Sequence, residues 1–171
     1  MTETRELRDS APGRDGDYRI TWRAHFVVGD RPVILDRTPM LGEPGGQTNG
    51  GYAGLAFRMA GPPLNVSMLS TTGLVTQFVA DRARPNAAAT AFNFLDGEKV
   101  VGGVAILTDA PAKDENPSWY LINGATFRFA CAAILAPKPI RHDAGDQFDL
   151  NYTIALRPKP WTVEELRAQP R

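Results

Sequence analysis

Apolar and polar residues alternate along two long stretches of the chain, at 18–28 and at 148–156. In the first, every second residue from Tyr18 onward is apolar and most of the residues between are polar; the second repeats this pattern from Phe148 onward. Successive side chains of a β-strand point to opposite faces of the sheet, so a period of two predicts a strand with one buried face. These are the two strongest strand predictions in the chain.

Weaker alternation elsewhere predicts further short strands, separated by turns rich in glycine, proline and aspartate. They lie at 33–35, 53–59, 65–70, 74–80, 89–95, 100–107 and 119–122. A tight turn at 96–99 would join two of them as a hairpin, and the turn at 29–32 would let 33–35 pair back onto 18–28. Residues 127–135 fit a strand through their alternating aromatic residues, but their alanines leave a helix open.

One helix is predicted, at 162–169, close to the C-terminus. Thr162 can cap its first turn, Glu165 completes a capping box three residues later, and Pro160 ends the strand before it. Roughly nine to eleven short strands without alternating helices are typical of an antiparallel sandwich or barrel. The sequence therefore predicts an all-β fold with one short C-terminal helix.

The length of 171 residues suits one domain. We expect a flexible polar lead-in at 1–17, which could include an irregular first strand, a sandwich at 18–160, and the helix and tail at 161–171. The 19 basic and 19 acidic residues cancel and do not cluster, which argues against nucleic acid as a partner. No stretch reaches the ~20 apolar residues of a membrane span, and 1–17 lacks the apolar segment of a secretory signal. We therefore expect no membrane partner and a cytoplasmic location.

The residues that most often carry metal or covalent chemistry are few. Cys131 lies in an apolar run, which indicates a buried core thiol rather than a nucleophile. His25 and His142 are far apart and neither has a metal-type partner nearby, so we predict no metal site. The glycines are not followed by the lysine of a phosphate-binding loop, so no cofactor is predicted either.

The stretch 36–59 concentrates glycine and proline between two predicted strands, and we expect any ligand to bind near it. Three carboxylates stand at strand ends or in loops, where sites are commonly built, and could supply an acid or a base: Asp36, Glu43 and Asp109. Each could equally cap a turn through its side chain.

Four further residues are candidate ligand contacts: Arg37, Asn49, Arg58 and Trp119. The two arginines flank the glycine-rich stretch and could present a planar fork to a carboxylate or to sugar hydroxyls, or could simply be solvated or ion-paired. Trp119 could stack on a sugar ring, although packing in the core is the alternative.

Several segments resemble a known family. They are 33–39, 45–59, 102–107, 117–120 and 137–139, and they resemble the bacterial PmoA-like ("methane oxygenase PmoA") family, whose function is unknown. The resemblance spans 18–160 and covers only the C-terminal half of the longer family members, whose first half carries a His-x-His-x-Arg-Gly motif that this chain lacks. It implies a supersandwich-like antiparallel β-sandwich, similar to domains of sugar epimerases and glycoside hydrolases. Methane oxidation is excluded, because the chain has neither apolar spans nor metal ligands.

Two functions follow as expectations, and catalysis is left open for the first. The first is a β-sandwich domain that binds, or helps to process, a carbohydrate or related small polar ligand near the glycine-rich stretch. The second is a non-catalytic assembly domain, half of a split or truncated protein, that joins a partner chain or a second copy through an unpaired sheet edge.

Overall fold

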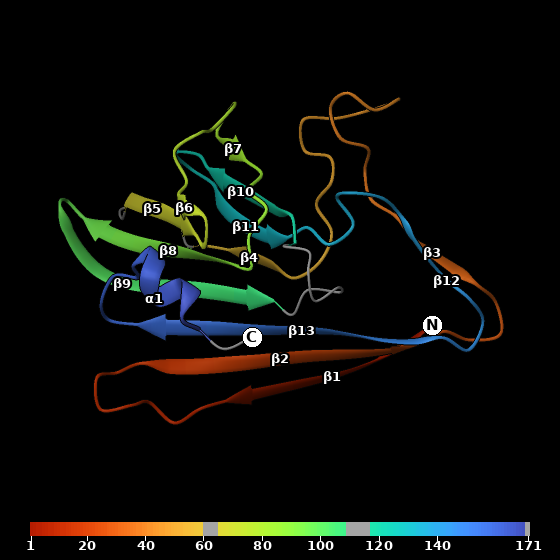
Figure 1. The fold of residues 1–171 in the computed structure, drawn as a ribbon, viewed down its shortest axis with the longest axis horizontal. Helices are drawn as coiled ribbons and strands as arrows, with labels where there is room; N and C mark the ends of the chain where they lie inside the picture. Colours follow the sequence, from red (N-terminus) through yellow and green to blue (C-terminus); the bar gives the residue numbers. More distant parts are fainter. Residues whose placement is uncertain (60–64, 109–116, 170–171) are drawn as a thin grey trace.

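The two strongly alternating stretches pair with each other in the middle of the larger sheet. In the computed structural model, which describes residues 1–59, 65–108 and 117–169, β2 (Tyr18–Val27) runs antiparallel to β13 (Gln147–Arg157). The other strands of this sheet are β1 (Thr2–Asp9), β5 (Asn65–Ser70), β6 (Gly73–Leu74), β8 (Ala89–Asp96) and β9 (Lys99–Thr108). The order across the seven strands is β1-β2-β13-β9-β8-β5-β6, with every neighbouring pair antiparallel (Figure 1).

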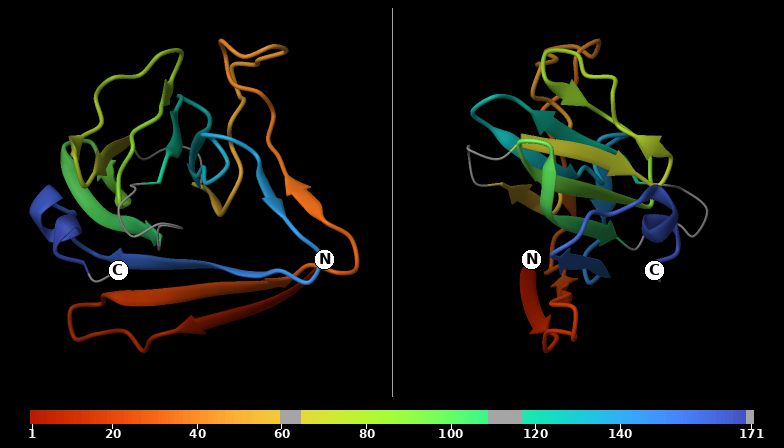
Figure 2. Two further views of the ribbon diagram at one scale, coloured as in Figure 1. Left: turned by 45° about the vertical axis from the view of Figure 1, so that its right-hand side comes forward. Right: turned by 90° about the vertical axis from the view of Figure 1, so that its left-hand side faces the viewer.

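A smaller sheet stacks on one face of the larger one. Its four strands, in spatial order, are β4 (Ala56–Arg58), β11 (Arg128–Ala132), β10 (Trp119–Asn123) and β7 (Arg82–Ala83). The main core lies between the sheets and includes the fully buried side chains of Phe92, Ile106, Trp119 and Leu121. The predicted all-β antiparallel sandwich is therefore confirmed. Figure 2 shows that β1 and β2 continue the larger sheet beyond the smaller one.

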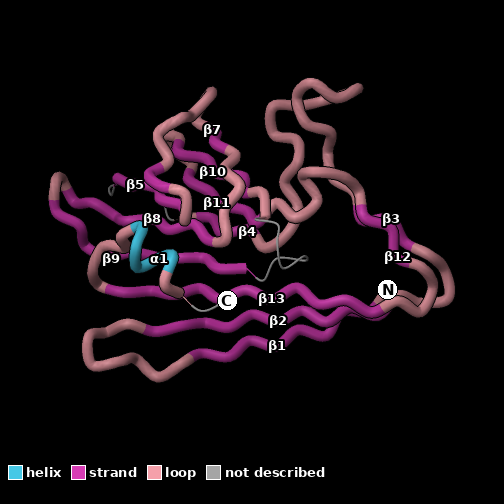
Figure 3. Tube along the Cα trace, in the orientation of Figure 1, coloured by secondary structure: helices cyan, strands magenta, loops and turns pink. Residues whose placement is uncertain are grey.

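The C-terminal helix α1 (Val163–Arg167) covers part of the opposite face of the larger sheet (Figure 3). Its capping box is confirmed, because the Thr162 hydroxyl accepts from the backbone N–H of Glu165 and the Glu165 carboxylate accepts from that of Thr162. Leu166 and Trp161 are buried against the alanines of the sheet below. No helix among the described residues is long and apolar enough to cross a bilayer.

Several predicted strand assignments differ from the structure. The polar lead-in at 1–17 contains β1, a regular strand paired with β2 over all eight of its residues. Because it is an edge strand with both faces largely exposed, it lacks the apolar alternation that marks a buried strand.

The prediction that 33–35 pairs with 18–28 is wrong. Both sides of β2 are occupied, by β1 and by β13, so β3 (Val33–Leu35) pairs instead with β12 (Ile140–His142) as a separate two-stranded ribbon. The strands predicted at 53–59 and 74–80 are much shorter than expected, as only Ala56–Arg58 and Leu74 of these stretches are in strands. The ambiguous stretch at 127–135 contains a strand, β11.

Candidate functional site

The glycine-rich stretch folds against the outer face of the smaller sheet. Between β3 and β4 it forms a loop whose turns are closed by backbone hydrogen bonds, from Gly50 N to Gln47 O at 2.9 Å and from Gly51 N to Thr38 O at 2.8 Å. A Cβ on Gly50 would lie 1.9 Å from the carbonyl oxygen of Pro39, so only glycine fits there. The loop is thus held tightly, with Met40 packed on the cluster of apolar side chains beneath it.

Three of the predicted site residues, Asp36, Arg37 and Glu43, come together at the start of this loop. The nearly buried guanidinium of Arg37 donates to Glu43 Oε1 at 2.6 Å, and Glu43 Oε2 accepts from the backbone N–H of Met40 at 2.7 Å. The Met40 hydrogen bond, aided by Arg37, lowers the pKa of Glu43. Glu43 is therefore held ionised as a hydrogen-bond acceptor within the loop, an unfavourable state for a general acid. Asp36 is exposed and accepts from the backbone N–H of Arg37 at 2.7 Å.

Asn49 lies at the far end of the loop, against the smaller sheet. Its Oδ1 accepts from Arg82 Nη2 at 2.7 Å and Nε at 3.0 Å, and from the Tyr120 hydroxyl at 3.1 Å. The guanidinium of Arg84 lies 4.3 Å above the Tyr120 ring and donates to the carbonyl of Gly50. Three donors already converge on the one oxygen of Asn49, so this network fastens the loop to the sheet.

The remaining predicted residues are dispersed. Arg58 is exposed and lies 4.8 Å over the ring of Phe127. Trp119, proposed as a stacking platform, is instead wholly buried in the main core and donates its indole N–H to the carbonyl of Ala87 at 2.8 Å, which leaves no face for a ligand. Asp109 lies outside the described residues. Cys131 is confirmed as a buried thiol, and burial raises its pKa to about 12.

A hollow of about 680 Å³ lies elsewhere, on the outer face of β1, β2 and β13. We call it the polar hollow, and its main lining side chains are Thr4, Glu6, Arg19, Thr21, Arg23, His25, Asp149, Asn151 and Thr153. The strand register sets these groups in rows across the three strands. Directly opposed side chains on one face lie ~5 Å apart, close enough to contact one ligand together.

Two of these rows carry most of the polar groups. One row runs Thr4–His25–Asp149, and within it His25 Nδ1 and Asp149 Oδ1 are 2.8 Å apart. This contact leaves His25 Nε2 without a partner among the described residues and fixes the orientation of the ring. The next row runs Glu6–Arg23–Asn151.

The sequence pattern predicts which residues of each strand share a face of the hollow, but not which strands pair to form it. The alternation in 18–28 places Thr21, Arg23 and His25 on one face, and that in 148–156 does the same for Asp149 and Asn151. The pairing that joins the two faces links residues far apart in the chain, such as His25 and Asp149, which are separated by 124 positions. Nothing in the local pattern specifies that pairing.

Among residues 1–59, 65–108 and 117–169, no group of three or more histidine, cysteine, aspartate or glutamate side chains is placed to hold a metal ion. Comparison with models of protein families finds no match to this chain, and comparison with curated proteins and with solved structures finds none either.

Proposed function

We propose that the protein binds a small, neutral, polyhydroxylated ligand of the sugar type in the polar hollow. The observation that carries the proposal is the set of cross-strand rows, which presents hydrogen-bond donors and acceptors together in one hollow of about 680 Å³. This volume lies in the range of small-molecule sites, ~300–1,000 Å³. We therefore propose the larger sheet as the ligand site, in place of the glycine-rich loop expected from the sequence.

The balance of charge in the polar hollow supports a neutral ligand. Arg19 and Arg23 supply guanidinium donors, while Glu6 and Asp149 supply carboxylate acceptors. A sugar hydroxyl both donates and accepts, so it can bridge a guanidinium and a carboxylate, whereas a ligand of either charge would meet a like charge in the hollow. The sugar-related role implied by the PmoA-like resemblance agrees with this proposal as an analogy of fold.

Titration calorimetry with a panel of neutral monosaccharides and their sugar acids tests the proposal. Arg23→Gln and Asp149→Asn remove one charge each from the polar hollow, and each should weaken binding of a neutral sugar about tenfold, the loss expected for one charge-assisted hydrogen bond. Asp143→Asn is the matched control, because Asp143, like Asp149, is an exposed aspartate in contact with a basic side chain, here Arg141 at 2.9 Å, but it lies outside the hollow.

Three outcomes would contradict the proposal. One is the absence of binding by every sugar in the panel, and another is binding that Arg23→Gln and Asp149→Asn leave unchanged. The third is binding lost in Arg58→Ala but kept in both hollow variants, which would locate the ligand on the smaller sheet instead.

A further inference from the structure

The strand β1 forms a long free edge of the larger sheet. It pairs with β2 on one side over eight consecutive residues, without a bulge and without a proline, and it is the last strand in the sheet order. The other edge strands of the two main sheets, within the described residues, have only two or three residues each. A regular edge of this length presents a row of backbone donors and acceptors that can pair with another strand.

We propose that β1 pairs antiparallel with β1 of a second copy about a twofold axis, with Leu7 facing the partner's Leu7. The two seven-stranded sheets would then form one continuous sheet. This inference is independent of the proposed ligand. It rests on the order of charges along β1. In some registers of a β1–β1 pair opposite charges face each other, and in others like charges do.

Symmetry limits the registers to a few. Opposed residues of an antiparallel pair project to the same face, so a symmetric pairing is centred on one residue. When the centre is Leu7, Glu6 faces the partner's Arg8 and Arg5 faces the partner's Asp9, each twice by symmetry. Every charged residue from position 5 to position 9 then has an opposite charge across the interface.

The neighbouring registers are worse. A centre at Arg5 or at Glu6 sets that charge against its own copy on the axis. A centre at Thr4 leaves Glu3 opposite the partner's Arg5 as the one type of ion pair. Like charges directly opposed in a sheet destabilise pairing, and opposite charges stabilise it. The register centred on Leu7 has the most favourable charge pattern of the four.

The exposed surface of β1 fits this register. Leu7 is 55% exposed in the single copy, and pairing would cover it with the partner's Leu7. The charged residues now pair within the strand, Arg5 with Glu3 and Arg8 with Glu6, and these four side chains are 32–67% exposed. Exposed pairs of this kind contribute little to stability, so exchanging them for pairs between copies costs little.

Sedimentation velocity of the full chain across a wide range of concentration measures the association, which should appear as a monomer–dimer equilibrium. Glu6→Arg sets two arginines against each other on both sides of the axis, so it should weaken the dimer about tenfold. The charge swap Glu6→Arg with Arg8→Glu should restore it, and this recovery separates lost pairing from misfolding. Glu98→Arg, at an exposed turn between β8 and β9, is the control and should leave the dimer unchanged.

Disulfide trapping tests the register itself. Facing Leu7 residues would have Cα atoms ~4.5–5.5 Å apart, within the range of a disulfide, so Leu7→Cys should form covalent dimers under mild oxidation. Thr4→Cys should not, because in this register the two copies of position 4 lie ~20 Å apart. The native Cys131 is buried and does not compete. A chain that stays monomeric throughout, a charge swap that fails to restore association, or stronger trapping at position 4 than at position 7 would overturn the proposal.

Discussion

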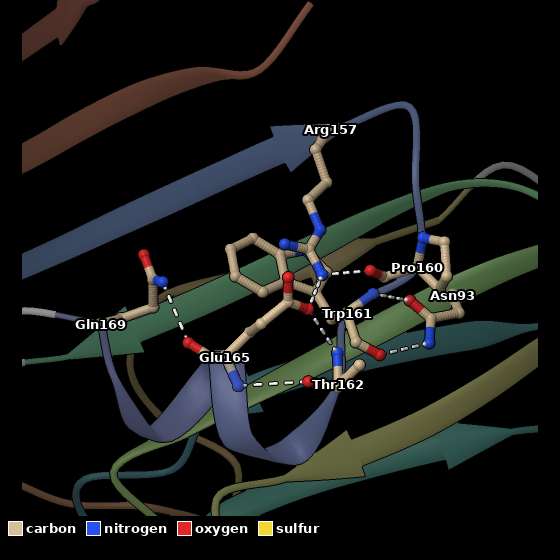
Figure 4. A network of polar contacts seen from close by, with 7 residues as sticks. All are labelled: Asn93, Arg157, Pro160, Trp161, Thr162, Glu165 and Gln169. Atoms are coloured by element: carbon tan, nitrogen blue, oxygen red, sulfur yellow. Dashed lines mark hydrogen bonds and ion pairs between the residues drawn. The ribbon is translucent and has the colours of Figure 1, made fainter. Parts of the chain in front are cut away.

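Glu165, whose pKa lies well below its ordinary value, has a structural role. Figure 4 shows its carboxylate between the Arg157 guanidinium, at 2.5 Å, and the backbone N–H of Thr162, at 3.1 Å. The side chain of Arg157 is nearly buried and stacks on Trp161 at 3.8 Å. The Arg157 hydrogen bond, aided by the Thr162 contact, lowers the pKa of Glu165 to about 2. The acid therefore completes the attachment of the C-terminal segment to the sheet.

This depressed pKa predicts how stability changes with pH. The ordinary value is 4.5, so the ionised form is favoured by folding, and its contribution is present above about pH 4.5 and is lost as the pH falls towards about 2. Because the carboxylate is half-exposed and screened, Glu165→Gln should lower the free energy of unfolding at neutral pH by only ~1 kcal/mol. Urea unfolding at several pH values measures the difference, which should shrink with acidification.

Glu164→Gln is the matched control for this prediction. Glu164 precedes Glu165 in the same helical turn and is exposed, so its substitution should change stability by less than ~0.5 kcal/mol. A deficit in Glu165→Gln that is equally large at pH 2 and at pH 7 would contradict the role given to its charge.

The candidate residues show what the sequence can and cannot predict about a site. The sequence places Asp36, Arg37 and Glu43 within eight positions, and they do meet. It does not predict that Arg37 and Glu43 use their hydrogen-bonding groups within the loop. That depends on how the loop closes and on the carbonyl of Ala136, 99 positions away, which accepts from Arg37. The burial of Trp119 likewise depends on the stacking of the two sheets, which places its side chain in the core between them.

At the scale of elements, α1 depends on the sheet beneath it. A helix of five residues is too short to be stable alone, so its stability comes from docking. Asn93 on β8 supplies the central contact (Figure 4). Its side-chain amide donates to the backbone carbonyl of Trp161 at 3.0 Å, and its Oδ1 accepts from the backbone N–H of Trp161 at 2.7 Å. Gly103 leaves the room for this arrangement, because a Cβ there would lie 2.8 Å from both Asn93 Oδ1 and the Trp161 ring.

Removal of this buried contact should destabilise the protein. Asn93→Ala leaves the N–H and the carbonyl of Trp161 unpaired in a buried setting, so we expect a loss of ~2–3 kcal/mol in the free energy of unfolding. Asn86→Ala is the comparison, since Asn86 is exposed and accepts one hydrogen bond, from Ser118 at 2.8 Å, and should cost less than ~1 kcal/mol. Equal losses in the two variants, measured by urea unfolding, would show that the buried Asn93–Trp161 contact stabilises the fold no more than the exposed Asn86–Ser118 contact.

Elements with one buried face were predictable from the sequence, whereas the edge strand β1 and the pairing of the short β3 were not. The alternation correctly predicts β2 and β13, and the capping residues correctly predict α1. The edge strand β1 has no buried face to leave an apolar pattern, and the short β3 has too few residues to specify its partner. Both are decided by which strand edges the rest of the fold leaves free, and this is not a local property of the chain.

The whole molecule is a sandwich that opens to one side. Beyond the smaller sheet, the inner face of β1, β2 and β13 borders an open groove of about 440 Å³, lined by apolar side chains that include Trp22, Phe26 and Leu150. Arg5 lies over the Trp22 ring at 5.0 Å. Among the described residues, copies could therefore associate through the charged edge of β1 or through the apolar side chains of this groove.

The response of association to salt distinguishes these two surfaces. Pairing of β1 edges in the register centred on Leu7 forms ion pairs between exposed residues, which salt screens, so sodium chloride should weaken the dimer by up to about tenfold. Association through the groove would bury apolar surface, which excluded salts such as sulfate strengthen. Sedimentation at increasing salt should therefore show dissociation, and the effect should be about halved in the double variant Glu6→Gln with Arg8→Gln, which removes one of the two types of ion pair. A dimer that tightens with either salt would exclude the β1 edge as the dominant interface and point to the groove, because the sign of the salt effect follows from the kind of surface that is buried.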